Sequence, residues 1–150
     1  MTRFRGITAT VAGAGAILLS ACGGSTSTSS KPASASDTRP PRIAATVGDY
    51  RITVDRDTMR SGIVSFDIRN DGRVAHEFVI LRSDHAADAL PREGDEVSEH
   101  AAGKLQDEAE GIDPGKTVNL ATSLKPGRYV LICNLTGHYR RGMHAGFRVT

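Results

Sequence analysis

The sequence has little of several features that define large classes of proteins. Only 5% of its 150 residues are aromatic, and tryptophan is absent. The 19 Lys and Arg residues nearly balance the 17 Asp and Glu residues, so no basic surface for nucleic acid is indicated. Beyond the N-terminal segment, no apolar run is long enough to cross a bilayer. The composition therefore argues against a nucleic-acid-binding protein and against a multispanning membrane protein.

The N-terminus has the features of a secretory signal peptide. A basic start, MTRFRG, precedes an apolar run from Ile7 to Leu19 that is too short to span a bilayer core of ~30 Å. The run ends in Leu-Ser-Ala-Cys22, which resembles the lipobox of bacterial lipoproteins. That resemblance implies cleavage before Cys22 and a lipid on its sulfur; the alternative is an ordinary signal peptide with a chance cysteine. We expect an exported protein, anchored by lipid to the extracytoplasmic face of the cell membrane.

The chain divides into three regions by composition. Residues 1–21 form the predicted signal peptide. Residues 22–41 comprise the lipidated cysteine and a stretch rich in Ser, Thr, Gly, Ala and Pro, which is typical of a disordered tether. Residues 42–150 form the predicted folded domain.

Alternation of apolar and polar residues dominates the folded region. It predicts seven short strands over residues 43–47, 50–54, 61–69, 76–81, 117–123, 128–133 and 142–150. Turn signals lie between them, among them Asn-Asp-Gly at 70–72 and Lys-Pro-Gly at 125–127. Short strands separated by turns predict an all-β fold, a β-sandwich.

An acidic stretch at residues 84–113 interrupts this alternation. Val97, Ala101 and Leu105 recur every four residues, which favours a short helix in a helical or loop insertion, although Gly103 weakens it. We interpret the acidic residues as a solvated face, with a docking patch as the less favoured alternative.

The two cysteines raise a chemical question. If Cys22 carries lipid, Cys133 has no intramolecular partner, whereas cysteines of exported proteins are usually paired. A leftover thiol outside the cytoplasm indicates an intermolecular bond, a reactive role or a metal.

A cluster of metal-binding residue types surrounds Cys133. The segment Cys133-Asn-Leu-Thr-Gly-His138-Tyr-Arg-Arg-Gly-Met143 brings a thiol, an imidazole and a thioether into one loop between two predicted strands. Sulfur and imidazole donors together are the set that copper prefers. Gly137 and Gly142 supply the backbone freedom that so tight a loop requires.

The Cys-x4-His-x4-Met spacing, with His76 at the start of an upstream strand (AHEFVI), resembles the blue-copper cupredoxins, in particular the azurin, rusticyanin and sulfocyanin-like branches. The resemblance implies a Greek-key β-sandwich that holds one copper ion, with His76, Cys133 and His138 as strong ligands and Met143 as a weak axial ligand. Many members carry Asn beside the first histidine. Here that neighbour is Ala75, and Asn134 could supply a similar bond.

Strand phase provides an independent check on these ligands. Met143, Ala145, Phe147 and Val149 share one face, so Met143 should point into the core and His144 outward. The same phase places His76 with Phe78 and Ile80, and Cys133 with Leu131 and Tyr129. The residues His85, His100, His144 and Met59 lack such a context, and we expect them at the surface.

The resemblance implies an electron carrier rather than an enzyme, since four protein ligands leave copper no open position. We expect a monomer that exchanges electrons with a redox partner. Because the family usually exposes the loop histidine, we expect Tyr139, Arg140 and Arg141 beside His138 to form a docking surface for an acidic partner. The alternatives are a copper carrier, or copper-resistance protein, that meets a copper-delivery partner, and a metal-free adhesive sandwich, which leaves Cys133 unexplained.

Overall fold

A computed structural model of the chain describes residues 39–150. The predicted signal peptide, Cys22 and most of the predicted tether lie outside the described residues. The first described strand, β1, spans Arg42–Gly48. No helix in the described part of the chain is long and apolar enough to span a membrane.

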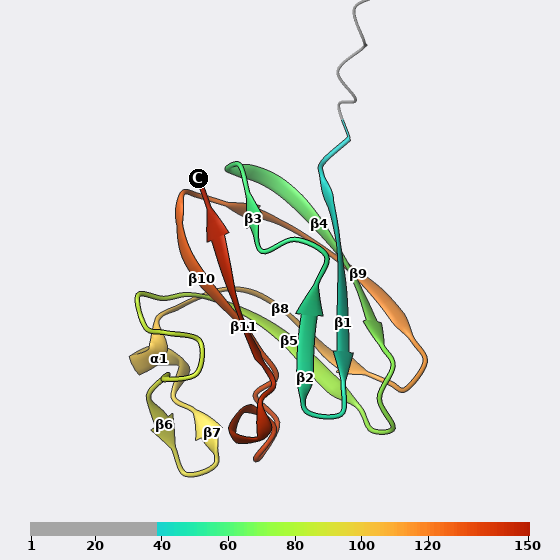
Figure 1. The fold of residues 1–150 in the computed structure, drawn as a ribbon, viewed down its shortest axis with the longest axis vertical. Helices are drawn as coiled ribbons and strands as arrows, with labels where there is room; N and C mark the ends of the chain where they lie inside the picture. The colour runs from blue at the N-terminus through green and yellow to red at the C-terminus, as the bar shows by residue number, and fades with distance from the viewer. Residues whose placement is uncertain (1–38) are drawn as a thin grey trace, which may run out of the picture. The chain divides into compact units, whose positions relative to one another are not determined.

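Two β-sheets form the body of residues 39–150 (Figure 1). The first has the order β2-β1-β4-β9 and is built from β1, β2 (Arg51–Val54), β4 (Gly62–Asn70) and β9 (Thr117–Leu124). The second has the order β3-β11-β10-β5-β8 and is built from β3 (Thr58–Met59), β5 (His76–Arg82), β8 (Lys104–Ile112), β10 (Gly127–Ile132) and β11 (His144–Val149). A small hairpin, β6 (Arg92–Glu93) and β7 (Glu96–Val97), stands apart from both sheets.

The strand connections confirm the predicted Greek-key β-sandwich. The pairs β1–β4 and β11–β3 are parallel, and the other pairs are antiparallel. The Asn70–Gly72 turn carries the chain from the first sheet to the second, so it does not close a hairpin. All seven predicted strands are present in the structure.

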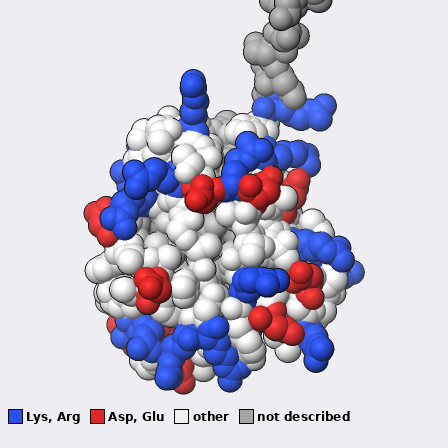
Figure 2. Space-filling view, viewed as in Figure 1, with Lys and Arg blue, Asp and Glu red and all other residues white. Residues whose placement is uncertain are grey.

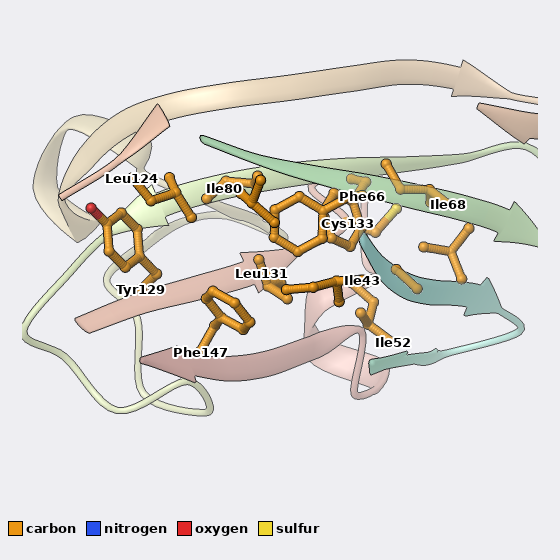
Figure 3. Close-up of a cluster of buried hydrophobic side chains, with 14 of the residues drawn as sticks. Ile43, Ile52, Phe66, Ile68, Ile80, Leu124, Tyr129, Leu131, Cys133 and Phe147 are labelled. Carbon is orange, nitrogen blue, oxygen red and sulfur yellow. The ribbon is translucent and has the colours of Figure 1, made fainter. Parts of the chain in front are cut away.

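The main core lies between the facing sides of the two sheets (Figure 3). The first sheet contributes Ile43, Phe66 and Ile68, and the second contributes Phe78 and Leu131, all of them fully buried. Along β1 and β4 the buried residues alternate with polar or small ones, which is how a sheet with one face in the core is built. The core is therefore the physical reason for the period of two in the sequence.

A second, smaller core covers the outer face of the second sheet. It joins Val79 and Leu81 of β5 and Ile132 of β10 to Leu90 and Val97 of the insertion between β5 and β8. Because β5 and β10 are covered on both sides, their sequences HEFVIL and RYVLIC are apolar at successive positions instead of alternating ones.

The prediction for the insertion was wrong over its second half. Only α1 (Glu99–Ala102) is helical, and Lys104–Ile112 forms the nine-residue edge strand β8, which pairs with β5. Charged side chains are common on edge strands because they discourage pairing with other chains. Because its composition is acidic, β8 was not predicted as a strand. Its pairing with β5 stabilises it nevertheless.

Replacing Phe66 by Ala should destabilise the domain strongly. Its ring is fully buried against Phe78 and Phe147 at centroid distances of 5.4 and 5.6 Å, and emptying such a site costs about 3–5 kcal/mol. Ile63→Ala, on the same strand with 60% of the residue exposed, should cost no more than about 0.5 kcal/mol. Urea unfolding measures both variants, and equal losses of free energy would contradict this assignment of the core.

Candidate metal centre

Two imidazoles and one thiol meet at one end of the sandwich. His76 is the first residue of β5, Cys133 follows β10 directly, and His138 precedes the 3-10 helix η1 (Tyr139–Arg141). The two Nδ1 atoms lie 3.3 Å apart, and Cys133 Sγ lies 3.9 Å from the Nδ1 of His76 and 3.4 Å from that of His138. Within residues 39–150, these three side chains form the group that could hold a metal ion.

The spacing of these three donor atoms suits a metal ion. A circle through three points with these separations has a radius of about 2.1 Å, the product of the sides divided by four times the triangle's area. Bonds of zinc, a transition metal with the same kinds of ligand, are about 2.0–2.1 Å long to nitrogen and about 2.3 Å to sulfur. The three donor atoms are therefore close enough together that His76, Cys133 and His138 would bind one ion without large movement of the chain.

Pairing between β5 and β10 brings the first histidine to the cysteine. The last pair of this ladder joins Ile132 to Val79, so the chain beyond Ile132 continues alongside the start of β5. There the backbone N–H of Glu77 donates to Cys133 Sγ over 3.3 Å. A hydrogen bond of this kind stabilises a thiolate and fixes the direction in which the sulfur points.

The loop between β10 and β11 places the second histidine and the methionine. Its glycines, Gly137 at φ 77° and Gly142 at φ 110°, adopt the left-handed backbone expected of them. The N–H of Cys133 donates to the carbonyl of Met143 over 3.2 Å, and the N–H of Met143 donates to that of His138 over 3.2 Å. These backbone bonds close the loop and hold its three predicted ligands within one short stretch of chain.

Strand phase places Met143 as predicted. Met143 is fully buried in the main core together with Phe147 and Val149, and Ala145 packs against that core. His144 lies on the other face, half-buried, with its ring 5.2 Å from that of Tyr139. The position of Met143 therefore agrees with the predicted inward-facing thioether.

Burial shifts the pKa values of all three donor groups toward their neutral forms. The pKa of Cys133 is raised, mainly by burial and against hydrogen bonds from the backbone of Glu77 and Leu135. The pKa of His76 is lowered, first by burial and then by the neighbouring His138, and the negative charge of Asp49 partly offsets this shift. Near neutral pH these shifts favour neutral imidazoles and a protonated thiol in the absence of metal, and a binding metal must displace the thiol proton.

His138 is the one donor of the three that reaches the surface. It is half-buried, whereas His76 and Cys133 are fully buried. Burial lowers its pKa, and the positive charge of Arg141 lowers it further. The ring of Tyr50 stands edge-on to it at 5.8 Å, and the Arg141 guanidinium lies over the Tyr50 ring at 4.6 Å. Sequence reasoning missed Tyr50, because no local pattern links the β1–β2 turn to a histidine 88 residues away.

Two residues were wrongly expected at the surface. Tyr139 is buried in the second core; its hydroxyl donates to Ala87 O over 2.8 Å and accepts the Leu90 N–H over 2.9 Å, so it cannot contact a partner. Met59 is buried in the main core on β3, a strand too short for its alternation to be visible. The other two histidines without a metal-binding context, His85 and His100, are exposed.

Asn134 ties the ligand loop to the insertion and not to the segment before His76. Its side-chain oxygen accepts the Val97 N–H over 2.7 Å, and its amide nitrogen donates to Val97 O over 3.2 Å and to Glu99 over 3.0 Å. The bond expected in place of the missing Asn at position 75 therefore runs elsewhere.

Comparison with known proteins supports the fold. No protein-family model matches the chain, and no curated protein sequence matches it. Among solved structures, an auracyanin from Roseiflexus castenholzii is 19% identical with a TM-score of 0.53, covering 73% of this chain and 96% of its own. Rusticyanin from Thiobacillus ferrooxidans is 15% identical with a TM-score of 0.57, covering 73% of this chain and 76% of its own.

A larger protein contains a similar domain. A multi-copper oxidase from Pediococcus acidilactici is 19% identical with a TM-score of 0.51, covering 79% of this chain but only 28% of its own. At these identities the likeness concerns the fold alone.

Replacing Tyr139 by Phe should loosen the insertion without removing a donor atom from the metal centre. The change leaves the buried Leu90 N–H and the Ala87 carbonyl without the hydroxyl, at a cost of about 1–3 kcal/mol. Hydrogen exchange at the Leu90 amide should accelerate. The matched control is Tyr129→Phe, which loses one bond, to Lys125 O, and should leave exchange at Leu90 unchanged. Unaltered exchange in Tyr139→Phe would contradict the anchoring role.

Proposed function

Because the chain has the cupredoxin fold predicted from its sequence, we propose that it is a copper-binding electron-transfer protein with one mononuclear type 1 site. His76, Cys133 and His138 are the strong ligands, and Met143 is the weak axial ligand. The protein is exported and held by lipid on Cys22 at the extracytoplasmic face of the membrane. It works as a monomer that meets a redox partner.

The donor set carries this proposal. Two imidazole nitrogens and one sulfur lie within 3.9 Å of one another, and this combination suits copper better than a hard, oxygen-loving cation. Bound copper would supply one-electron Cu(II)/Cu(I) chemistry. The chain's own contribution is to hold the donors close together in the same place for both oxidation states and to exclude water from them.

Burial favours electron transfer over copper delivery. A carrier passes its ion on by exchanging ligands with a recipient, so its donor atoms must be reachable. Here His76, Cys133 and Met143 are all 0% exposed, and only His138 reaches the surface. An electron can pass through the edge of one imidazole, whereas an ion cannot leave without opening the loop.

The proposal excludes catalysis on the copper for the same reason. Four protein donors would leave no open position for a substrate, and the buried faces of His76 and Cys133 leave no path to one. The similar multi-copper oxidase is more than three times as long as the part it shares with this chain. Its activity therefore does not carry over to a single domain.

Copper loading of the full chain tests the proposal. With Cu(II), the protein should develop the intense visible band of a copper–thiolate bond and an EPR signal with small parallel hyperfine coupling, and it should be reduced reversibly at an electrode. Cys133→Ser should abolish the band because it removes the sulfur. His100→Ala, at an exposed histidine outside the cluster, should leave the spectrum unchanged. Copper bound without colour or reversible reduction would favour the carrier instead.

Two exposed arginines follow His138 closely in the chain. Figure 2 shows Lys and Arg side chains along the lower edge of the molecule, the end at which the ligand loop lies in Figure 1. Arg140 and Arg141 are exposed; Arg140 pairs with Asp95 of the insertion, and Arg141 bonds the Tyr50 hydroxyl. With Tyr139 buried, the proposed docking surface for an acidic partner reduces to the two arginines. Such rim charges mainly set the rate of association.

Charge reversal at Arg140 and Arg141 should slow the reaction of the reduced protein with an anionic oxidant, hexacyanoferrate(III). Loss of electrostatic steering is worth about tenfold or more at low ionic strength, and the dependence of rate on salt should flatten. Arg60→Glu serves as the matched control for each single reversal, Arg140→Glu and Arg141→Glu, since Arg60 lies beside Ser61, which bonds Thr150 at the far end of β11. Stopped-flow absorbance follows all of these variants; equal rates for them would reject the docking surface.

A further inference from the structure

A buried amide supports the turn that precedes His76. Asn70 is the last residue of β4, is 0% exposed, and uses both ends of its side chain. Its Oδ1 accepts the Gly72 N–H over 2.8 Å, while its Nδ2 donates to Val74 O over 2.8 Å and to Ile112 O over 2.7 Å. Both hydrogens of the amide are used, so few other side chains could fill this place.

The two carbonyls that Asn70 binds belong to two segments next to His76: the chain that leads into it and the strand that pairs with it. Val74 precedes His76 by two residues in the chain. Ile112 is the residue that pairs with His76 across the β5–β8 ladder, next to a break in its register. One side chain therefore joins the backbone leading into His76 to the backbone lying opposite it, at a point where the ladder alone gives incomplete support.

The turn that Asn70 holds packs against the Nε2 side of the His76 ring, opposite the Nδ1 atom that faces the cluster. A Cβ atom on Gly72 would lie 2.8 Å from His76 Nε2 and 2.7 Å from Asp49 Oδ1, so only glycine fits here without movement of its neighbours. Asp49 Oδ1 in turn accepts the Arg73 N–H over 2.9 Å, which fixes the turn from its other side. Nε2 is buried with no hydrogen-bond partner among the described residues, so packing, rather than a bond to the ring, sets its position.

We infer that Asn70 is a positioning residue for the metal centre: by fixing the turn at residues 71–75 against Ile112, it holds the His76 imidazole with Nδ1 toward Cys133 and His138. The chain of contact runs from the amide to the turn backbone, from Gly72 to the back of the ring, and from the ring to the cluster. The identity of the metal rests on the proposed function, whereas the placement of the ring does not.

A merely structural role for Asn70 would give a different result from a positioning role. Loss of a buried hydrogen-bonded amide lowers stability wherever it occurs. Replacing a residue that places the ligand should also change the position of the His76 ring in the folded protein. It should weaken metal binding by more than the loss of stability alone explains. Supports one step behind a metal ligand typically change metal affinity by about 10–100-fold when removed.

The experiment compares Asn70→Asp, Gly72→Ala and wild type, each with and without copper. Asn70→Asp keeps the side-chain shape but turns an acceptor toward the carbonyls of Val74 and Ile112. Gly72→Ala leaves Asn70 intact and presses on the ring itself. In the metal-free proteins, two-dimensional NMR of the imidazole nitrogens should show shifted or doubled His76 signals. In the copper-loaded proteins, the dissociation constant should rise about 10–100-fold, with a changed EPR hyperfine coupling.

Asn119→Asp is the matched control, because it makes the same chemical change in β9, where the Asn119 amide bonds Ser65 and Asp67. It should lower the melting temperature while leaving the His76 signals and copper affinity as in wild type. Wild-type His76 signals and affinity in every folded variant would overturn the inference. If Asn70→Asp does not fold, the smaller and uncharged Asn70→Ser, which also removes the amide that bonds the carbonyls of Val74 and Ile112, takes its place in both measurements. If wild type binds no copper, the proposed function fails, but the metal-free NMR spectra still decide the placement of the ring.

Discussion

The candidate metal centre depends on the antiparallel pairing of β5 with β10. These strands bring His76 and Cys133 together although 57 residues separate them in the chain. The register that joins Ile132 to Val79 turns Cys133 to the inner face and sets its sulfur against the N–H of Glu77. A slip of one residue would turn the cysteine to the outer face, because neighbouring side chains on a strand point to opposite sides. Anything that fixes this register therefore fixes the site.

Two cores fix that register. The inner side of β5 and β10 packs into the sandwich, and their outer side packs against the insertion, with Tyr139 fastening the insertion to the ligand loop. A strand buried on both faces cannot shift without exposing apolar side chains on both. Burial also has an electrostatic consequence, since it disfavours charge on His76 and Cys133 while no metal neutralises the cluster. The same packing that orders the ligands thus keeps them neutral and closed to solvent.

Much of this arrangement could be predicted from the sequence because it follows from local patterns. Alternation identified most of the seven main strands and the inward direction of Met143, while continuous apolar runs identified the strands at 76–81 and 128–133. The residue types around Cys133 indicated a metal. The edge strand β8 was not predicted, because its acidic residues are also typical of a solvated loop. Tyr139 escaped because the carbonyl and amide that make it structural lie about fifty residues away, at Ala87 and Leu90. The roles of Tyr50 and Asn70 were not predicted for the same reason. They arise from contacts between segments that lie far apart in the chain, and no local sequence pattern indicates such contacts.

The two halves of the site are supported in the same way, by side chains that bond to backbone. On one side the Asn70 amide binds the turn before His76; on the other the Tyr139 hydroxyl and the Asn134 amide bind the insertion, whose hairpin lies beside the ligand loop. None of these bonds uses a donor atom of the cluster, so none has to break when a metal arrives. The donor geometry is consequently built by the polypeptide before binding, and little of the binding energy is needed to order it. For the one-electron chemistry that we propose, a frame held independently of the ion would also limit how far the ligands move when the charge of the site changes.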